Sequence, residues 1–158
     1  GLGVGIGNAF ISGAIKEIYE KEYSKVDDYL TMKVFLQFVE DPDERKRIWT
    51  LWRKDLLSQA GIALFFMGNK INTQTTSVVL ADGMEEEFKI AKDLGLKIIP
   101  IGASGYKAKE LFDRVIADFD QYYPNATPQF REAFEKLDES VEEPLQLLSK
   151  ILNVIKLI

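Results

Sequence analysis

Apolar residues recur along this chain with two different spacings, and the changes between them mark the predicted elements. Intervals of three and four residues are typical of an amphipathic helix, whereas short uninterrupted apolar runs are typical of buried strands. The helical spacing covers about residues 8–22, 43–60, 84–94 and 106–121. The apolar runs are residues 62–67 and 97–101. Since helices and strands alternate, the pattern predicts an α/β fold with a parallel sheet and right-handed crossovers.

Individual residues predict where some of these elements begin and end. Asp41 is placed to cap the second helix, with Pro42 at its first position, and Gly61 is placed to end it. Pro100 has no N–H to donate to a neighbouring strand, so the strand 97–101 is expected at or near the edge of the sheet.

Two other segments are less regular, and two further helices are predicted near the end of the chain. Residues 29–38 mix β-forming residues with partial alternation, which predicts another strand near a sheet edge. Residues 71–77 are polar and rich in threonine, which predicts a mobile surface loop. Two helices are predicted at about 128–139 and 141–156, and their apolar surface must pack on the sheet, on a partner subunit or on a neighbouring domain.

Glycine occupies alternate positions at the start of the chain, Gly1, Gly3, Gly5 and Gly7, and an amphipathic helix follows directly. Glycine lets backbone N–H groups approach an anion closely, and a helix N-terminus adds further donors and the positive end of its dipole. The pattern therefore favours a phosphate-binding turn. A flexible or tight N-terminal segment is the alternative, because the strand that should precede such a turn is missing from the sequence.

The amino-acid composition excludes several kinds of site and partner for this chain. A chain of 158 residues with 46% hydrophobic residues can bury a core, and this length suits one domain over residues 1–158. The absence of cysteine and histidine excludes disulfides, thiolate nucleophiles, cysteine-ligated zinc and imidazole catalysis, and no metal site is expected. A net charge of -5 argues against nucleic acid as a partner. No apolar run suits a membrane span or a secretory signal, so a cytoplasmic location is expected.

Three glycine-bearing loops are expected to meet at one edge of the sheet. Ligands of open α/β sheets bind beyond the carboxyl ends of the strands, where residues 1–7, 68–70 and 102–105 should gather. Their convergence favours a nucleotide-type ligand more than any single loop does.

Three charged residues are candidates for contacting such a ligand. The Lys70 ammonium could neutralise a phosphate, or it could be a solvated loop lysine. Glu85, at the start of the third helix, could accept hydrogen bonds from ribose hydroxyls or simply interact with the helix dipole. Arg53 could hold a diphosphate with its planar guanidinium or bind the last carbonyl groups of its own helix.

These motifs together resemble a SLOG domain. The resemblance is carried by the segments 1–8, 56–70 and 83–88. Arg53, Lys70 and Glu85 stand in the order and at the separations that make it specific. It covers nearly the whole chain and implies a Rossmann-like parallel sheet flanked by helices, without the first strand–helix–strand portion and with residues 128–158 as a C-terminal helical extension. More narrowly, the chain is similar to the C-terminal SLOG modules of sirtuin-like, NAD-hydrolysing effectors of Thoeris anti-phage defence.

In that family the SLOG module senses a cyclic ADP-ribose isomer made by a TIR-domain protein, and binding switches on a sirtuin-like domain of the same polypeptide. The resemblance implies that this chain is no enzyme and needs no cofactor, whereas the full-length protein is an NAD+ hydrolase and a homo-oligomer, a tetramer. The implied ligand contacts are Arg53 and Lys70 to the phosphates, Glu85 to a ribose or base, and Gly1, Gly3 and Gly5 to the diphosphate.

Two other functions stay open. A nucleotide-cleaving phosphoribohydrolase of the related LOG type would use Glu85 or Glu86 as a lone acid or base. The Pro-Gly-Gly-x-Gly-Thr-x-x-Glu signature of that branch is absent around residues 82–87. A purely structural oligomerisation domain would explain the apolar C-terminal helices but not the glycine loops or Lys70.

Overall fold

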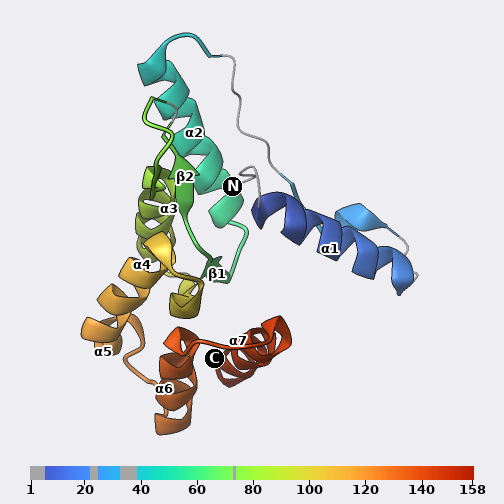
Figure 1. Ribbon diagram of the computed structural model, residues 1–158, viewed down its shortest axis with the longest axis vertical. Helices are drawn as coiled ribbons and strands as arrows, with labels where there is room; N and C mark the ends of the chain where they lie inside the picture. The colour runs from blue at the N-terminus through green and yellow to red at the C-terminus, as the bar shows by residue number, and fades with distance from the viewer. Residues whose placement is uncertain (1–5, 22–24, 33–38, 73) are drawn as a thin grey trace. The chain divides into compact units, whose positions relative to one another are not determined.

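The computed structural model describes residues 6–21, 25–32, 39–72 and 74–158 (Figure 1). The chain separates into two units, Gly1–Ser58 and Gln59–Ile158. Where it is described, the first unit consists of the helix α1 (Ile6–Glu20), the 3₁₀ turn η1 (Val26–Asp28) and the helix α2 (Pro42–Leu57).

Helix α2 begins as its sequence predicts and ends earlier. The Asp41 carboxylate accepts a hydrogen bond from the Asp43 amide at 2.9 Å, and Pro42 occupies the first helical position, so the predicted cap is confirmed. The predicted end at Gly61 is wrong. The Ser58 amide donates to the Lys54 carbonyl at 2.9 Å and closes the last turn three residues before the glycine.

The predicted strand at 29–38 is wrong over its described part. The amides of Tyr29 and Leu30 both donate to the Val26 carbonyl, at 3.0 and 2.9 Å, so the chain continues the η1 turn instead of extending into a strand. Residues 29–32 carry no strand, and residues 33–38 lie outside the described part of the chain.

The second unit is built on two parallel strands, β1 (Ile62–Phe65) and β4 (Lys97–Pro100). Ala63 is in register with Ile98, and Phe65 with Pro100. The helix α3 (Asp82–Asp93) lies between them in sequence and packs on both strands, as a crossover helix does. This arrangement confirms the predicted α/β fold with a parallel sheet.

Among the residues that the structure describes, the strand β4 pairs with β1 alone and so lies at an edge of this sheet, as Pro100 predicts. The Lys97 and Ile101 amides donate to the β1 side, at Gly61 and Phe65. Since backbone groups alternate in direction along a strand, the groups of Ile98 and Pro100 face away from β1. The buried Tyr123 hydroxyl donates to the Ile98 carbonyl at 2.6 Å from outside the strand pair, and burial raises the pKa of this phenol above its ordinary value.

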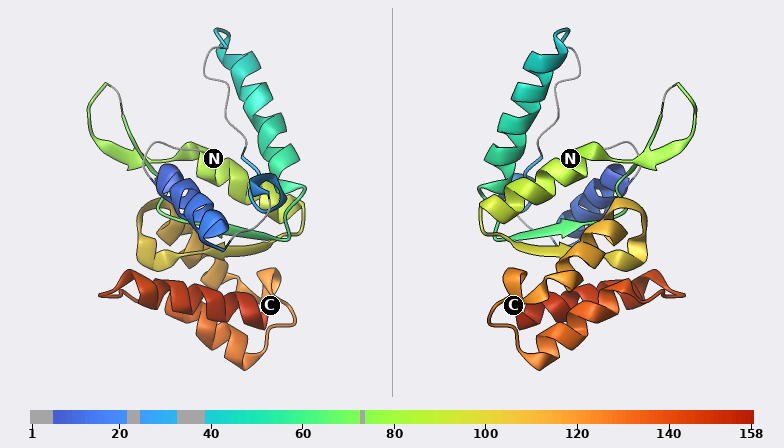
Figure 2. Two further views of the ribbon diagram at one scale, coloured as in Figure 1. Left: turned by 90° about the vertical axis from the view of Figure 1, so that its right-hand side faces the viewer. Right: turned by 90° about the vertical axis from the view of Figure 1, so that its left-hand side faces the viewer.

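Residues 71–77, predicted as a loop, include part of a β-hairpin. The strands β2 (Asn69–Ile71) and β3 (Val78–Leu80) pair antiparallel, with Ile71 opposite Val78. The Asn72 side chain accepts the Gln74 amide at 2.9 Å and shapes the turn between the strands. Figure 2 shows the hairpin projecting beyond the strands β1 and β4.

The remaining helices are α4 (Tyr106–Ala117), α5 (Phe119–Tyr122), α6 (Pro128–Glu135) and α7 (Pro144–Leu157), with the 3₁₀ turn η3 (Lys136–Asp138) after α6. Figure 2 shows α3 on one side of the strand pair, and α6 and α7 on the other. Of the three packing partners open for the apolar C-terminal helices, the structure supplies the sheet of the same unit.

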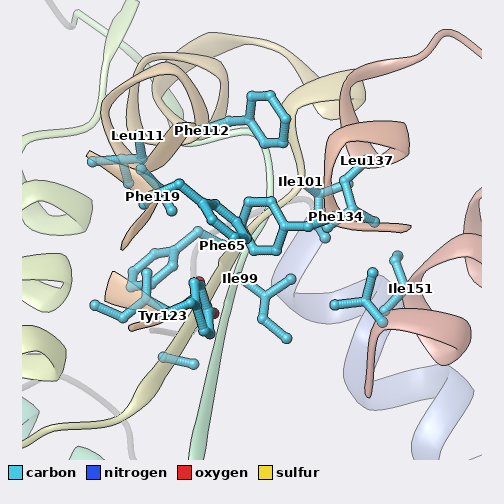
Figure 3. Packing of buried hydrophobic residues seen from close by; sticks show 14 of the residues in the cluster. Phe65, Ile99, Ile101, Leu111, Phe112, Phe119, Tyr123, Phe134, Leu137 and Ile151 are labelled. Atoms are coloured by element: carbon cyan, nitrogen blue, oxygen red, sulfur yellow. The ribbon is translucent and has the colours of Figure 1, made fainter. Parts of the chain in front are cut away.

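Aromatic side chains join this C-terminal layer to the sheet (Figure 3). Phe134 is fully buried and lies edge-on to Phe119 and Tyr123, with ring centroids 5.3 and 5.5 Å apart. Ile99 and Ile101 are fully buried in the same core cluster. In the ranges that the structure describes, no helix combines the length and apolar character needed to cross a membrane.

Candidate ligand-binding site

The two loops that follow β1 and β4 are hydrogen-bonded to each other at the carboxyl end of the strands. The Met67 amide donates to Ser104 Oγ at 2.8 Å, and Ser104 lies in the 3₁₀ turn η2 (Gly102–Ser104) after β4. The Met67 carbonyl in turn accepts from the Ala108 amide, at 2.8 Å, in the first turn of α4. The loops after β1 and β4 therefore meet, as predicted, and the contact is made by Met67, one residue before the range 68–70, and by Ser104. Residues 1–5 of the third glycine loop lie outside the described residues.

Both loops contain residues in the left-handed backbone region. Met67 and Gly68 have φ values of 53° and 84°, and Gly105 and Tyr106 have 74° and 53°. Non-glycine residues in this region carry strain, and such residues cluster at ligand sites. The strain at Met67 and Tyr106 thus falls at the place where an open α/β sheet binds its ligand.

Gly68 has no room for a side chain. A Cβ atom there would lie 2.5 Å from Met84 Sδ and 2.8 Å from Lys107 Cβ. The hairpin, α3 and α4 are therefore held close together around this glycine. The Gly68 carbonyl also accepts the Ala81 amide at 2.8 Å, which ties the base of the hairpin to the start of α3.

Lys70 forms an ion pair with the carboxylate of Asp82. Its Nζ lies 2.6 Å from Asp82 Oδ2, at the first position of α3, and the Lys70 side chain is 48% exposed. The hydrogen bond from Lys70 lowers the pKa of Asp82 below its ordinary value. A ligand phosphate that binds Lys70 must compete with this carboxylate.

Glu85 is held by two cations of α4. Arg114 Nη1 donates to Oε1 at 2.6 Å and Arg114 Nη2 to Oε2 at 3.1 Å, and Lys107 Nζ lies 2.8 Å from Oε2. The Arg114 hydrogen bonds, with a contribution from Lys107, lower the pKa of Glu85 from 4.5 to about 2 despite partial burial. Glu85 therefore stays ionised and offers only hydrogen-bond acceptors to a ligand.

Lys107 connects the two ion-pair groups of this site. It contacts Glu85 and also Glu110, each at 2.8 Å, while only 14% of its side chain is exposed. It also contributes to lowering the pKa of Asp82. Lys70 and Glu85 thus belong to adjoining groups at the start of α3, each with its own partner of opposite charge.

Arg53 belongs to the first unit. Its side chain is buried, at 8% exposure, and its guanidinium carbon lies 6.0 Å from the centre of the Trp49 ring, one helical turn earlier in α2. Lys70 and Glu85 belong to the second unit. The joint action of the three residues on one ligand stays a prediction.

The comparison with known protein families identifies the family to which this chain belongs. The model of the Sir2- and TIR-associating SLOG family, STALD, matches residues 1–158, the whole chain. The chain belongs to this SLOG family. The Rossmann-like architecture of SLOG domains agrees with the parallel strands β1 and β4 and the helices that cover them.

Curated relatives of this SLOG chain carry the name NAD(+) hydrolase ThsA. The protein from Acinetobacter baumannii (strain 532279) is 74% identical over 162 residues, which cover 100% of this chain and 34% of that protein. The protein from Cytobacillus dafuensis is 34% identical over 98% of this chain and 31% of its own length. The protein from Bacillus cereus (strain MSX-D12) is 30% identical over 100% of this chain and 32% of its own. The SLOG chain thus spans about a third of the length of the curated relatives it matches.

Sequence reasoning missed the partners that hold the candidate residues of this SLOG domain. Asp82, Lys107 and Arg114 form the ion pairs of the site, and Ser104 joins its two loops. A signal existed for two of them, because Lys107 and Arg114 are seven residues apart and therefore lie on one face of α4. What the sequence did not supply was the packing of that face against α3.

Proposed function

We propose that this chain is the ligand-sensing domain of an antiviral defence effector, where it binds a cyclic ADP-ribose isomer and so activates the NAD+ hydrolase domain of the longer protein. The observation that carries the proposal is the pair of loops after β1 and β4, joined through Met67 and Ser104. Lys70 and Glu85 lie close to that junction, on the hairpin and on α3.

The chemistry of these residues suits the diphosphate and ribose groups of a cyclic ADP-ribose isomer. A diphosphate carries negative charge that the Lys70 ammonium can neutralise once it leaves Asp82, and the Arg53 guanidinium can bind two phosphate oxygens at once. Ribose hydroxyls donate hydrogen bonds, and the ionised Glu85 carboxylate accepts them. The N-terminal glycines Gly1, Gly3 and Gly5 would supply backbone N–H groups to the phosphates.

The hydrolase itself would lie outside this chain. The relatives named NAD(+) hydrolase ThsA are about three times as long, and the family name associates SLOG domains with Sir2 and TIR partners. In this proposal a TIR-domain protein supplies the cyclic signal, and a sirtuin-like domain of the same polypeptide, assembled as a homo-oligomer, cleaves NAD+. The ligand activates by binding the active arrangement more tightly than the inactive one.

Calorimetric titration tests the proposal. The 158-residue chain, and a chimera in which it replaces the matching third of the Acinetobacter baumannii protein, would be titrated with cyclic ADP-ribose isomers, linear ADP-ribose and NAD+. We expect tight binding of one cyclic isomer and ligand-dependent NAD+ hydrolysis by the chimera. Absence of binding to all of these nucleotides would overturn the proposal.

Substitutions then test the site. Arg53→Ala, Lys70→Ala and Glu85→Ala should each weaken binding by about 1.5–3 kcal/mol, because each removes a charged hydrogen-bonding partner. Lys89→Ala, an exposed lysine of α3, and Glu132→Ala, a glutamate paired with Lys136 on α6, are matched controls that should bind normally. Unchanged affinity in all three site variants would remove these residues from the site.

A further inference from the structure

The Glu85 carboxylate has most of its hydrogen-bonding capacity taken by the protein itself. Arg114 Nη1 donates to Oε1, Arg114 Nη2 donates to Oε2, and Lys107 Nζ lies 2.8 Å from Oε2. An ionised carboxylate offers about four lone-pair directions, two on each oxygen. After these contacts with the described residues one direction remains, on Oε1, and the Glu85 side chain is exposed enough for a ligand to reach it.

Arg114 occupies the end of the carboxylate where the two oxygens point the same way. Its two terminal nitrogens donate to different oxygens, which is the parallel, two-point geometry of a guanidinium that faces a carboxylate end-on. A ribose diol would need the same end, because its two neighbouring hydroxyls must each donate to a different oxygen at once. The Phe88 ring packs against the guanidinium and holds it there. A diol is therefore excluded from this face of Glu85.

Lys107 takes the second lone-pair direction of Oε2 and is held there by contacts of its own. Its ammonium also lies 2.8 Å from Glu110, and its Cβ lies 2.8 Å from where a Cβ at Gly68 would be, so the side chain is packed along its length. Hydrogen bonds to Glu110 and Glu85 raise the pKa of Lys107 above its ordinary value, so it stays a cation. A neutral hydroxyl brings no charge to replace this cation, and it therefore adds to the existing contacts of Glu85 instead of displacing them.

We propose that Arg114 and Lys107 restrict Glu85 to a single ligand hydroxyl, accepted at Oε1, so that the site recognises one hydroxyl of a ribose and makes no use of its neighbour. Both are positioning residues, because they act on the ligand through Glu85. This selectivity rests on the proposed function, since it concerns the nucleotide that Glu85 would bind, and it adds which part of the ribose is recognised.

Calorimetric titration with analogues that each lack one hydroxyl tests this selectivity. The 158-residue chain would be titrated with cyclic ADP-ribose isomers, with linear ADP-ribose, and with analogues of each from which one ribose hydroxyl has been removed. Removal of a hydroxyl that Glu85 binds should weaken binding to the wild type at least about tenfold and have no further effect in Glu85→Ala. We expect one such hydroxyl in each ligand that binds. Two of them on one ribose, or none at all, would overturn the proposal, whereas a wild-type chain that binds no nucleotide would overturn the proposed function as well.

Substitution of Arg114 tests how the restriction arises. Arg114→Met opens the end of the Glu85 carboxylate to a diol, so removal of the neighbouring hydroxyl should now also weaken binding, about threefold or more, in ligands whose ribose carries both. Arg114→Lys, which holds one oxygen at a time, should show an intermediate effect. Arg131→Met is the matched control, because Arg131 is a similarly exposed arginine paired with Glu135 on α6, and it should keep the wild-type pattern.

A merely structural role of Arg114 would change the affinity for all analogues alike. The same dependence on single hydroxyls in Arg114→Met and in the wild type would therefore contradict its positioning role. Circular dichroism of each variant verifies folding, and the comparison of analogues on the wild-type chain needs no variant of Arg114 at all.

Discussion

Arg114, on the neighbouring helix α4, donates hydrogen bonds to both carboxylate oxygens of Glu85, at 2.6 and 3.1 Å. The two-point contact fixes the orientation of the carboxylate as well as its charge. The Arg114 guanidinium also lies 5.3 Å from the centre of the Phe88 ring, one turn further along α3, so the cation is itself positioned by packing. Glu85 is thus a rigid acceptor on the surface of α3.

The Glu85–Arg114 pair predicts a pH-dependent contribution to stability. The pKa of Glu85 falls from 4.5 in its ordinary state to about 2 in the fold, so the pair stabilises the protein above about pH 4.5 and is lost as the pH falls toward 2. The Glu85 side chain is 42% exposed, and solvent screening limits the contribution to on the order of 0.5–1 kcal/mol. Urea unfolding of wild type and Glu85→Gln at several pH values measures it.

We expect wild type to have a larger free energy of unfolding than Glu85→Gln at neutral pH. This difference should disappear as the pH falls from about 4.5 toward 2. Arg114→Gln should remove the same stabilisation. Arg114→Lys should keep part of it, because a lysine ammonium can replace only part of the two-point contact that the arginine guanidinium makes with Glu85. A difference between wild type and Glu85→Gln that stays constant down to pH 2 would contradict the assignment.

Removing Asp82 should improve the proposed ligand binding. Asp82 holds Lys70 at 2.6 Å and adds a negative charge beside the place where phosphates would bind. Asp82→Asn releases the lysine, so we expect the affinity for the cyclic ligand to rise about two- to fivefold, the range of an exposed ion pair. Calorimetry at two salt concentrations measures the change. Asp113→Asn, which breaks an ion pair with Lys109 on α4, is the control and should leave affinity unchanged, and weaker binding by Asp82→Asn would contradict this role.

Gly68→Ala should destabilise the second unit by about 1–3 kcal/mol. The added methyl group would meet the Lys107 Cβ and the Met84 sulfur, and the φ value of 84° disfavours any residue with a Cβ. Thermal or urea unfolding measures the loss. Gly61→Ala is the matched control, because a Cβ at Gly61 meets nothing within 4 Å. Equal stability of the two variants would mean that α3, α4 and the hairpin are not packed around Gly68.

Local chemistry made several elements of this fold predictable. Asp41 and Pro42 mark the start of α2 within a few residues of sequence, and the apolar runs of β1 and β4 are identified as strands without distant information. Burial was predicted correctly only for β4, because Ile62 and Leu64 of β1 are exposed. The meeting of the loops after these strands follows from parallel pairing alone. These features depend on neighbours in sequence or on one general rule of sheet topology.

Other elements depend on contacts that no local pattern reports. The hairpin strands β2 and β3 are almost wholly exposed, so neither shows the alternation that burial imposes, and only the pairing of Ile71 with Val78 defines them. Glu85 and Arg114 are 29 residues apart, and their contact exists because α3 and α4 pack side by side. Gly61 looks like a helix end in sequence, but the hydroxyl and amide of Ser58 satisfy the last turn first.

The outer edge of β4 sets a direction for any growth of this sheet. At Ile98 the carbonyl is already taken by the Tyr123 hydroxyl, and at Pro100 there is no N–H to offer. An extended peptide arriving on this side would find the Ile98 carbonyl occupied and no N–H at Pro100, so it could not form a regular ladder of hydrogen bonds there. Regular growth of this sheet is therefore favoured beside β1 over the outer edge of β4.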